Sequence, residues 1–201
     1  MIETQTLPSA NRQIARAAGT VAAAMVISQI TGLISTSLVG STFGSGIESE
    51  AYFAGNRFAE ILFNLMAGGA LGSAFIPTFT GLLAQEQRGR AWKLASSIAN
   101  LVLLVLTTVA ILSWVFARPI VDHVLAPGFD AAKAELTAQM LRIQLPSAII
   151  FGLSGLVMGI LNAHQRFLLP ALAPAMYRLG IIFGTLVLSK SMGIAGAAWG
   201  V

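Results

Sequence analysis

The polar and charged side chains best placed to do chemistry lie on one face of a single apolar segment, residues 50–77. At about 100° per residue they fall within an arc of roughly 120°, and Phe58 and Leu62 lie outside it. The members of this polar stripe are Glu50, Asn56, Arg57, Glu60 and Asn64. In water the pattern would be an ordinary amphipathic helix, so its meaning depends on the solvent around the rest of the chain.

The composition indicates that this solvent is lipid. Of the 201 residues, 56% are hydrophobic and 10% are charged, whereas a soluble domain has about 25% charged residues. The net charge of +4 comes from Lys and Arg scattered between apolar runs, which favours positively charged membrane loops over a nucleic-acid surface. The sequence has no Cys, and His123 and His164 stand far apart without acidic residues at ligand spacing. We therefore expect no catalytic centre, no metal site and no cofactor.

The apolar runs predict an all-α integral membrane protein, a polytopic helical transporter lobe with five full spans and the start of a sixth. A flexible tail at 1–11 precedes a lobe at 12–201. The spans are expected at 17–47, from 47 through the polar stripe to 85, and at 94–117, 145–163 and 167–189. The second is expected to weaken at Gly68 and Gly69 and to kink at Pro77. Residues 194–201 are too few to cross a bilayer, so we expect a lobe truncated in its sixth helix and a longer natural protein.

Turn residues separate the spans. Residues 44–46 are expected to end the first, and the sequence Ala-Pro-Gly-Phe at 126–129 is expected to form a turn, since Pro restricts φ and Gly tolerates a reversal. Asp130 can then cap the next helix. Residues 130–144 are expected to form an amphipathic interfacial stretch, with Pro146 near the start of the fourth span.

The first span carries its own polar arc, which includes Ser28 and Gln29 together with Gly32, Ser35 and Thr36. Small and hydroxyl side chains allow another helix to approach closely. The alternative is that Gln29 contributes to a polar cavity.

Arg57 and Glu60 lie three residues apart in the expected hydrocarbon region. A charge near the bilayer centre costs at least about 2.5–3.5 kcal/mol, so it is usually retained for a pathway or a binding site. Alternatively, the spacing allows the two side chains to neutralise each other. Arg178, about halfway along the fifth span, is another candidate partner for Glu60.

Four sets of residues resemble motifs of a known family. Residues 43–46 and 50–53 resemble its FGAG and DAFF-type opening of the second helix, residues 69–77 its GAFSQAFVP, and residues 126–129 its APGF. Residues 161–174 match the pattern LN-x-x-x-RF-x-x-P-x-x-AP. Together, across nearly the whole chain, these motifs resemble the N-terminal half of the MurJ/MviN lipid II flippases, within the multidrug/oligosaccharidyl-lipid/polysaccharide exporter superfamily.

The chain departs from this family pattern at its cavity arginines. Where the family has arginines in the first helix, this sequence has Gln29 and Ser35, and Phe63 and Asn64 replace a paired arginine in the second. Gly68 stands in place of a glutamate. Arg57 aligns with a position that is often basic in the family, so one cation is kept.

The resemblance implies two lobes around a central cavity and alternating access that flips lipid II, the lipid-linked peptidoglycan precursor, to the outer leaflet of the bacterial inner membrane. Arg57 would attract the pyrophosphate, while Gln29, Asn56 and Asn64 would form hydrogen bonds with sugar or phosphate. Glu60 would tune Arg57 or carry a coupling ion, and Ser28 and Glu50 complete the expected substrate-binding set.

The expected partners are the lipid-linked substrate, membrane lipids and the C-terminal half of the same transporter, with no nucleic acid. One alternative function is export of another lipid-linked sugar, or drug/cation antiport, within the same superfamily. A different class is a transport-inactive membrane scaffold in cell-wall synthesis, which the missing arginines would permit.

The loops predict a cytoplasmic N-terminus, because this orientation places more cations inside than outside. The inner set would be Arg12, Arg16, Arg88, Arg90, Lys93 and Arg166, and the outer set Arg118, Lys133, Arg142 and Lys190.

The absence of native Cys allows a direct test of this topology by single-cysteine labelling in intact cells. An impermeant thiol reagent should label cysteines placed at Ser45, Ala131 and Ser191, and it should leave those at Ser9, Gly89 and Gln165 unlabelled. The reverse pattern would invert the topology.

Overall fold

The computed structural model describes residues 10–64 and 74–201, and every regular element in these two ranges is a helix. The elements are α1 (Ala10–Phe43), α2 (Ile47–Asn64), α3 (Ile76–Ala84), α4 (Arg88–Val115), α5 (Ala117–Ile120), the π-helix η2 (Val121–Leu125), α6 (Ala131–Ala163), α7 (Leu168–Phe183), the π-helix η3 (Gly184–Leu188), α8 (Ser189–Met192) and α9 (Ile194–Trp199). The prediction of an all-α chain is confirmed.

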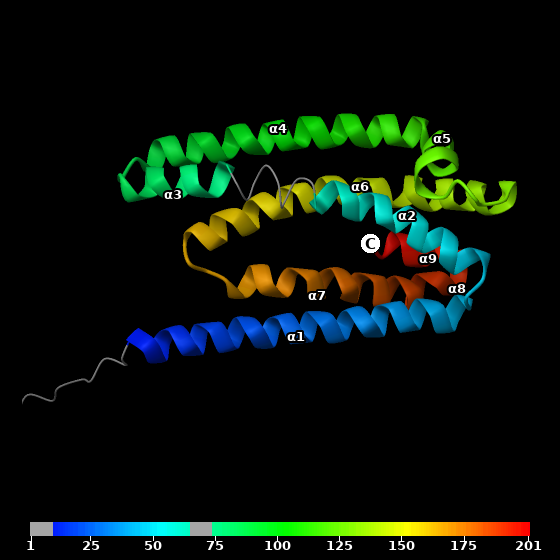
Figure 1. Ribbon diagram of the computed structural model, residues 1–201, viewed down its shortest axis with the longest axis horizontal. Helices are drawn as coiled ribbons and strands as arrows, with labels where there is room; N and C mark the ends of the chain where they lie inside the picture. The colour runs from blue at the N-terminus through cyan, green and yellow to red at the C-terminus, as the bar shows by residue number, and fades with distance from the viewer. Residues whose placement is uncertain (1–9, 65–73) are drawn as a thin grey trace, which may run out of the picture.

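The long helices lie side by side, and their connections fall at two opposite ends (Figure 1). The turn between α1 and α2, the segment α5–η2 and α8 lie at one end, and the turns α3–α4 and α6–α7 lie at the other. Successive connections therefore alternate between the ends, as a chain that repeatedly crosses a bilayer requires.

Four helical segments are long and apolar enough to cross a membrane: Ala18–Phe43, Arg88–Val115, Ala131–Ala163 and Leu168–Met192. The second expected span consists of α2 and α3, and its predicted weak point at Gly68 and Gly69 lies outside the described residues. Pro77 lies in the first turn of α3, where a missing N–H is tolerated. Five full spans with a partial sixth remain a prediction.

Most of the predicted turns are where the sequence indicated. α1 ends at Phe43 and Gly44 has φ 73°, a left-handed conformation that glycine adopts readily. Residues 126–129 form a turn, and the Asp130 side chain caps α6 by accepting a hydrogen bond from the Lys133 N–H. α4 begins at Arg88, earlier than the expected position 94.

The predicted division of 130–163 into an interfacial helix and a separate span is wrong. α6 runs unbroken from Ala131 to Ala163, with Pro146 in its interior. One face of its first half is buried, because α2 approaches it so closely that a Cβ on Gly55 would lie 3.0 Å from the Leu141 nitrogen. Neighbouring helices can hold a proline-containing helix together in this way.

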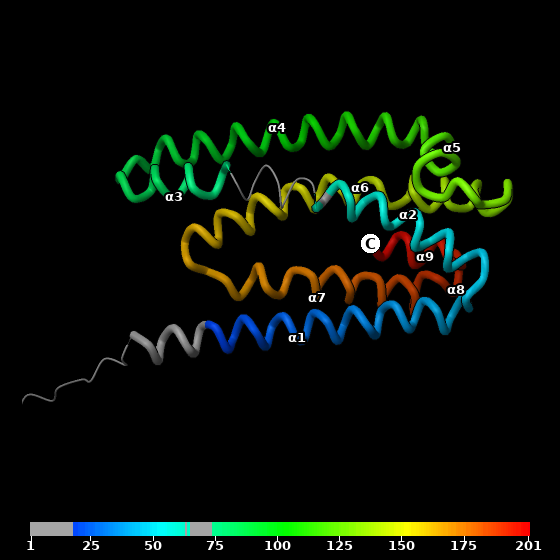
Figure 2. Tube along the Cα trace, viewed as in Figure 1, coloured from blue at the N-terminus to red at the C-terminus, as the bar shows by residue number. Residues whose placement is uncertain are grey.

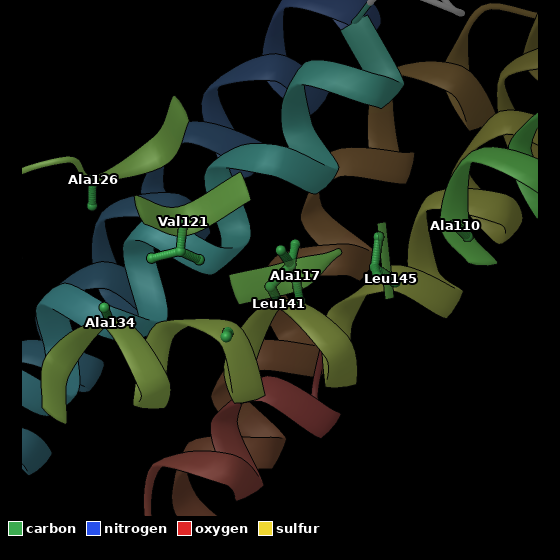
Figure 3. Close-up of a cluster of buried hydrophobic side chains, with 8 residues drawn as sticks. Ala110, Ala117, Val121, Ala126, Ala134, Leu141 and Leu145 are labelled. Carbon is green, nitrogen blue, oxygen red and sulfur yellow. The ribbon is translucent and has the colours of Figure 1, made fainter. Parts of the chain in front are cut away.

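α6 is the central helix of the bundle. α2 and α4 both pack on it, while α1 runs along α7 (Figure 2). Near its N-terminal end α6 meets α4, α5 and η2 in a core of mostly small side chains (Figure 3). The core comprises Ala110, Ala117, Val121, Ala126, Ala134, Ala138, Leu141 and Leu145. Small residues permit the close helix contacts that stabilise bundles in lipid, where there is little hydrophobic driving force between helices.

The C-terminal helix α9 folds back onto α7 and η3 through glycines. Gly193, at φ 58°, reverses the chain between α8 and α9. A Cβ on Gly184 would lie 2.6 Å from the Gly196 carbonyl oxygen and 2.8 Å from the Gly200 Cα. The space beside Gly184, where η3 crosses α9, is therefore filled by the backbone of Gly196 and Gly200. Backbone cannot move aside as a flexible side chain can.

Gly184→Ala should destabilise the fold by about 1–3 kcal/mol, because the added methyl group overpacks a backbone contact. Gly40→Ala is the matched control, since a Cβ there meets nothing within 4 Å. Thermal unfolding in detergent should show a midpoint several degrees lower for the first variant and no loss for the second. Equal midpoints would contradict the close packing of α9.

A polar cavity between α1, α2 and α7

Three members of the polar stripe of α2, Asn56, Arg57 and Glu60, line a cavity of about 240 Å³. α1 and α7 supply its other walls. The lining residues are Ser35, Thr36 and Val39 of α1, Tyr52, Phe53, Asn56, Arg57 and Glu60 of α2, and Arg178 and Ile181 of α7. Two arginines and one glutamate thus share a small space within a largely apolar bundle.

Glu60 pairs with Arg178 and not with its helical neighbour Arg57. The Arg178 guanidinium nitrogen lies 3.9 Å from a Glu60 carboxylate oxygen. Within residues 10–64 and 74–201, Arg57 makes no ion pair, and it is exposed at the cavity wall. The sequence left both partners open for Glu60, and the tertiary structure selects the remote one.

A hydrogen bond between Asn56 and Tyr177 links the same two helices. The Asn56 amide donates to the Tyr177 hydroxyl at 2.7 Å, and Asn56 is 6% exposed. The Tyr177 ring in turn lies against the side chain of Arg178. The ring centroid is 5.2 Å from the Arg178 guanidinium carbon. α2 therefore orients Arg178 both through its counter-ion and through this tyrosine.

α1 contributes small residues to the cavity. A Cβ on Gly32 would lie 3.7 Å from the Arg178 Nε, so α1 passes close to the arginine at this point. Ser35 is buried, and its hydroxyl donates to the Gly32 carbonyl oxygen at 2.8 Å. The expectation that the polar arc of the first span permits close helix approach agrees with this geometry.

Tyr52 adds a polar atom that has no hydrogen-bond partner among the described residues. This atom is the hydroxyl oxygen, and the Tyr52 side chain is 1% exposed and lines the cavity. A buried hydroxyl without a partner is destabilised by its lost hydration. Such a group is suited to bind water or a ligand.

The remaining candidate residues lie away from the cavity in the part of the chain that the structure describes. Ser28 joins α1 to α7, with its hydroxyl 2.9 Å from the Ala24 carbonyl oxygen and 3.1 Å from that of Ala171. Gln29 and Asn64 are exposed. Glu50 forms an ion pair with Lys133 of α6, at the end of α2 that adjoins the turn from α1.

Sequence reasoning missed Tyr52 and Tyr177 as members of this site. Tyr177 stands next to a mid-span arginine, and this polar pair within an apolar run is a signal that could have found it. Tyr52 lies outside the polar arc, about 40° from its nearest member at 100° per residue. Its unpartnered hydroxyl can be recognised only when the neighbouring helices are in place.

The charge of the cavity suits an anion. The guanidinium groups of Arg57 and Arg178 exceed the single carboxylate of Glu60, and guanidinium groups bind phosphate oxygens with planar, bidentate geometry.

These features define a polytopic α-helical membrane protein with a polar cavity between its helices. Residues 39–201 match the family model described as "Lipid II flippase MurJ". The chain belongs to this family of bacterial membrane proteins.

The relatives agree with this assignment. A probable lipid II flippase MurJ of Synechocystis is 32% identical over 174 residues, which cover 87% of this chain and 32% of the relative. One of Bdellovibrio bacteriovorus is 30% identical and covers 99% of this chain and 39% of the relative. A solved lipid II flippase MurJ in an inward closed conformation matches with a TM-score of 0.78 and 30% identity, over 90% of this chain and 38% of that one. The chain thus spans about a third of the length of the relatives it matches.

Tyr177→Phe should lower stability by about 1–3 kcal/mol, because it leaves the buried Asn56 amide without its acceptor. Asn64→Ala is the matched control. Asn64 is exposed at the end of α2, the helix that also carries Asn56, so its loss should change stability little. Thermal unfolding in detergent measures both. An unaltered midpoint for Tyr177→Phe would show that the Asn56–Tyr177 bond does not hold α2 to α7.

Proposed function

We propose that this chain is the N-terminal lobe of a transporter that flips lipid II, the lipid-linked peptidoglycan precursor, to the outer leaflet by alternating access. The observation that carries the proposal is the cationic cavity between α1, α2 and α7 in a chain of this family. An anionic lipid headgroup needs such a polar site to pass between leaflets, because hydrocarbon excludes charge.

In this proposal Arg57 attracts the pyrophosphate. Its side chain lines the cavity, and no carboxylate in the described residues neutralises it. Asn56 lines the same wall beside it, while Glu60 tunes the local charge or carries a coupling ion. Ser28, Gln29, Asn64 and Glu50 complete the proposed substrate path outside the cavity.

The proposed setting is the bacterial inner membrane, with the N-terminus in the cytoplasm and several passes across the bilayer. The lobe would act with the C-terminal half of the transporter, since an isolated half-cavity would expose Arg57 and Glu60 to lipid at a cost of several kcal/mol. The proposed reaction breaks no covalent bond, so the protein would act as a transporter and not as an enzyme.

A transport-inactive scaffold in cell-wall synthesis is the second candidate. Gln29 and Ser35 stand where the family resemblance leads us to expect arginines, and the absence of these cations would permit this alternative. The two functions differ in whether the cavity cation is needed for growth.

Arg57→Ala should abolish growth when the full gene product is the only flippase in the cell, because the headgroup then loses its cation. The double variant Arg57→Ala/Glu60→Gln should remain inactive, although it contains no unpaired charge at these positions. Arg57→Lys should retain partial activity, since a point charge still attracts phosphate without bidentate geometry. The measurement is complementation in flippase-depleted cells, with membrane abundance quantified for each variant.

Full activity of the double variant would show that Arg57 serves only to balance charge. Full activity of Arg57→Ala itself would favour the scaffold, provided that a translocation assay on the wild type also finds no flipping. Residues 1–201 alone, reconstituted in liposomes, are expected to be inactive.

A further inference from the structure

We propose that Arg178 is a second anion-binding residue of the cavity and that Glu60 is its exchangeable counter-ion, which a pyrophosphate group displaces on binding. This inference rests on the proposed function for its biological setting, but its test measures binding alone. Arg178 is not among the residues that the sequence assigned to the substrate.

The first support is that the Arg178 donors have no hydrogen-bond acceptor among the residues that the structure describes. In the described part of the chain its guanidinium makes no hydrogen bond, and its single ion pair, with Glu60, has a nitrogen–oxygen distance of 3.9 Å. A guanidinium group carries five N–H donors in a planar fork that matches phosphate. At this site the fork is open toward the cavity.

Arg118 shows how a structural arginine is bound in the same protein. Its Nε donates to the Asp122 carboxylate at 2.9 and 3.0 Å, and a terminal nitrogen donates to Glu135 at 3.2 Å and to the Ala131 carbonyl oxygen at 3.1 Å. Its donors are engaged by several partners at once. The contrast indicates that Arg178 is held near its counter-ion but is not locked to it.

The second support is that the position of Arg178 is set by other contacts. The Tyr177 ring lies against the guanidinium, Tyr177 is held by Asn56, and Gly32 leaves room for the side chain beside α1. Exchange of Glu60 for another anion would leave these contacts in place. A preorganised donor group loses less entropy when it binds a ligand.

The third support is the buried Tyr52 hydroxyl, which lines the same cavity without a partner among the described residues. A hydroxyl can donate to a phosphate oxygen. Glu60 is 40% exposed at its side chain, so water in the cavity can solvate its carboxylate once the anion has taken Arg178.

The test is equilibrium binding of farnesyl pyrophosphate to the full transporter in nanodiscs, with farnesol as the control for its apolar part. Inorganic pyrophosphate is titrated separately, so that a lipid-borne pyrophosphate can be distinguished from a free one. Tighter binding of farnesyl pyrophosphate than of either control indicates a lipid pyrophosphate, and equal binding of inorganic pyrophosphate indicates a site for the free anion. In both cases the pyrophosphate should require Arg178.

Arg178→Gln should weaken pyrophosphate binding by about ten-fold or more, because it removes a charge-assisted contact. Glu60→Gln should strengthen it by about two- to five-fold, because the competing pair is partly exposed and weak. Arg178→Gln/Glu60→Gln should remain weak, and Arg178→Lys should bind at an intermediate level. Arg88→Gln is the matched control, since it removes an exposed arginine at the start of α4, and it should bind like the wild type.

Wild-type affinity in Arg178→Gln, or recovery of affinity in the double variant, would overturn the proposal and leave the pair as a structural link. If Arg178→Gln does not fold, the affinity of Glu60→Gln for pyrophosphate is the deciding measurement. The proposal is overturned if this variant binds no more tightly than the wild type. Arg178-dependent binding without lipid II flipping by the full transporter would reject the proposed function and leave the anion site standing. Lipid II flipping by the full transporter, with no effect of Arg178→Gln on binding, would reject the anion site at Arg178 and leave the proposed function standing.

Discussion

The structure depends on the need to keep charged side chains of the membrane-spanning region away from hydrocarbon. Glu60 and Arg178 meet this need across two helices that are distant in sequence, and Asn56 and Tyr177 form a neutral link beside them. Both contacts join α2 to α7, and both lie at the cavity wall. The polar groups that are costly in lipid thus hold the cavity together, and they are also the groups able to meet an anionic ligand.

The apolar packing around the cavity gives these polar contacts their geometry. α6 carries α2 along its first half, where Gly55 brings the two backbones together, and α4 packs on it as well. α1 lies along α7 on the other side (Figure 2). The cavity therefore lies where the pair α1–α7 meets α2, and few direct contacts join α1 to α2. A small shift of the pair α1–α7 relative to the pair α2–α6 would change the width of the cavity without unfolding a helix.

The charge of the cavity comes from two helices that are distant in sequence. Ser35 lines the cavity from α1 and supplies no charge. Arg57 and Arg178 supply it from α2 and α7. The electrostatic potential in a small cavity depends on the sum of its charges and much less on which helix carries them.

The sequence by itself determined the helical membrane class, most of the turns and the polar stripe of α2, because composition, 3.6-residue periodicity and turn chemistry are local properties. It also identified Arg57 and Glu60 as the charges that require explanation. Only the tertiary structure decided that Glu60 pairs with Arg178, since i, i+3 spacing permits a contact without enforcing one. The same holds for the continuity of α6 through Pro146, which depends on the helices packed around it, and for Tyr52 and Tyr177, whose roles arise from groups on other helices. Pairing between helices is a non-local choice, and the pattern of one segment does not contain it.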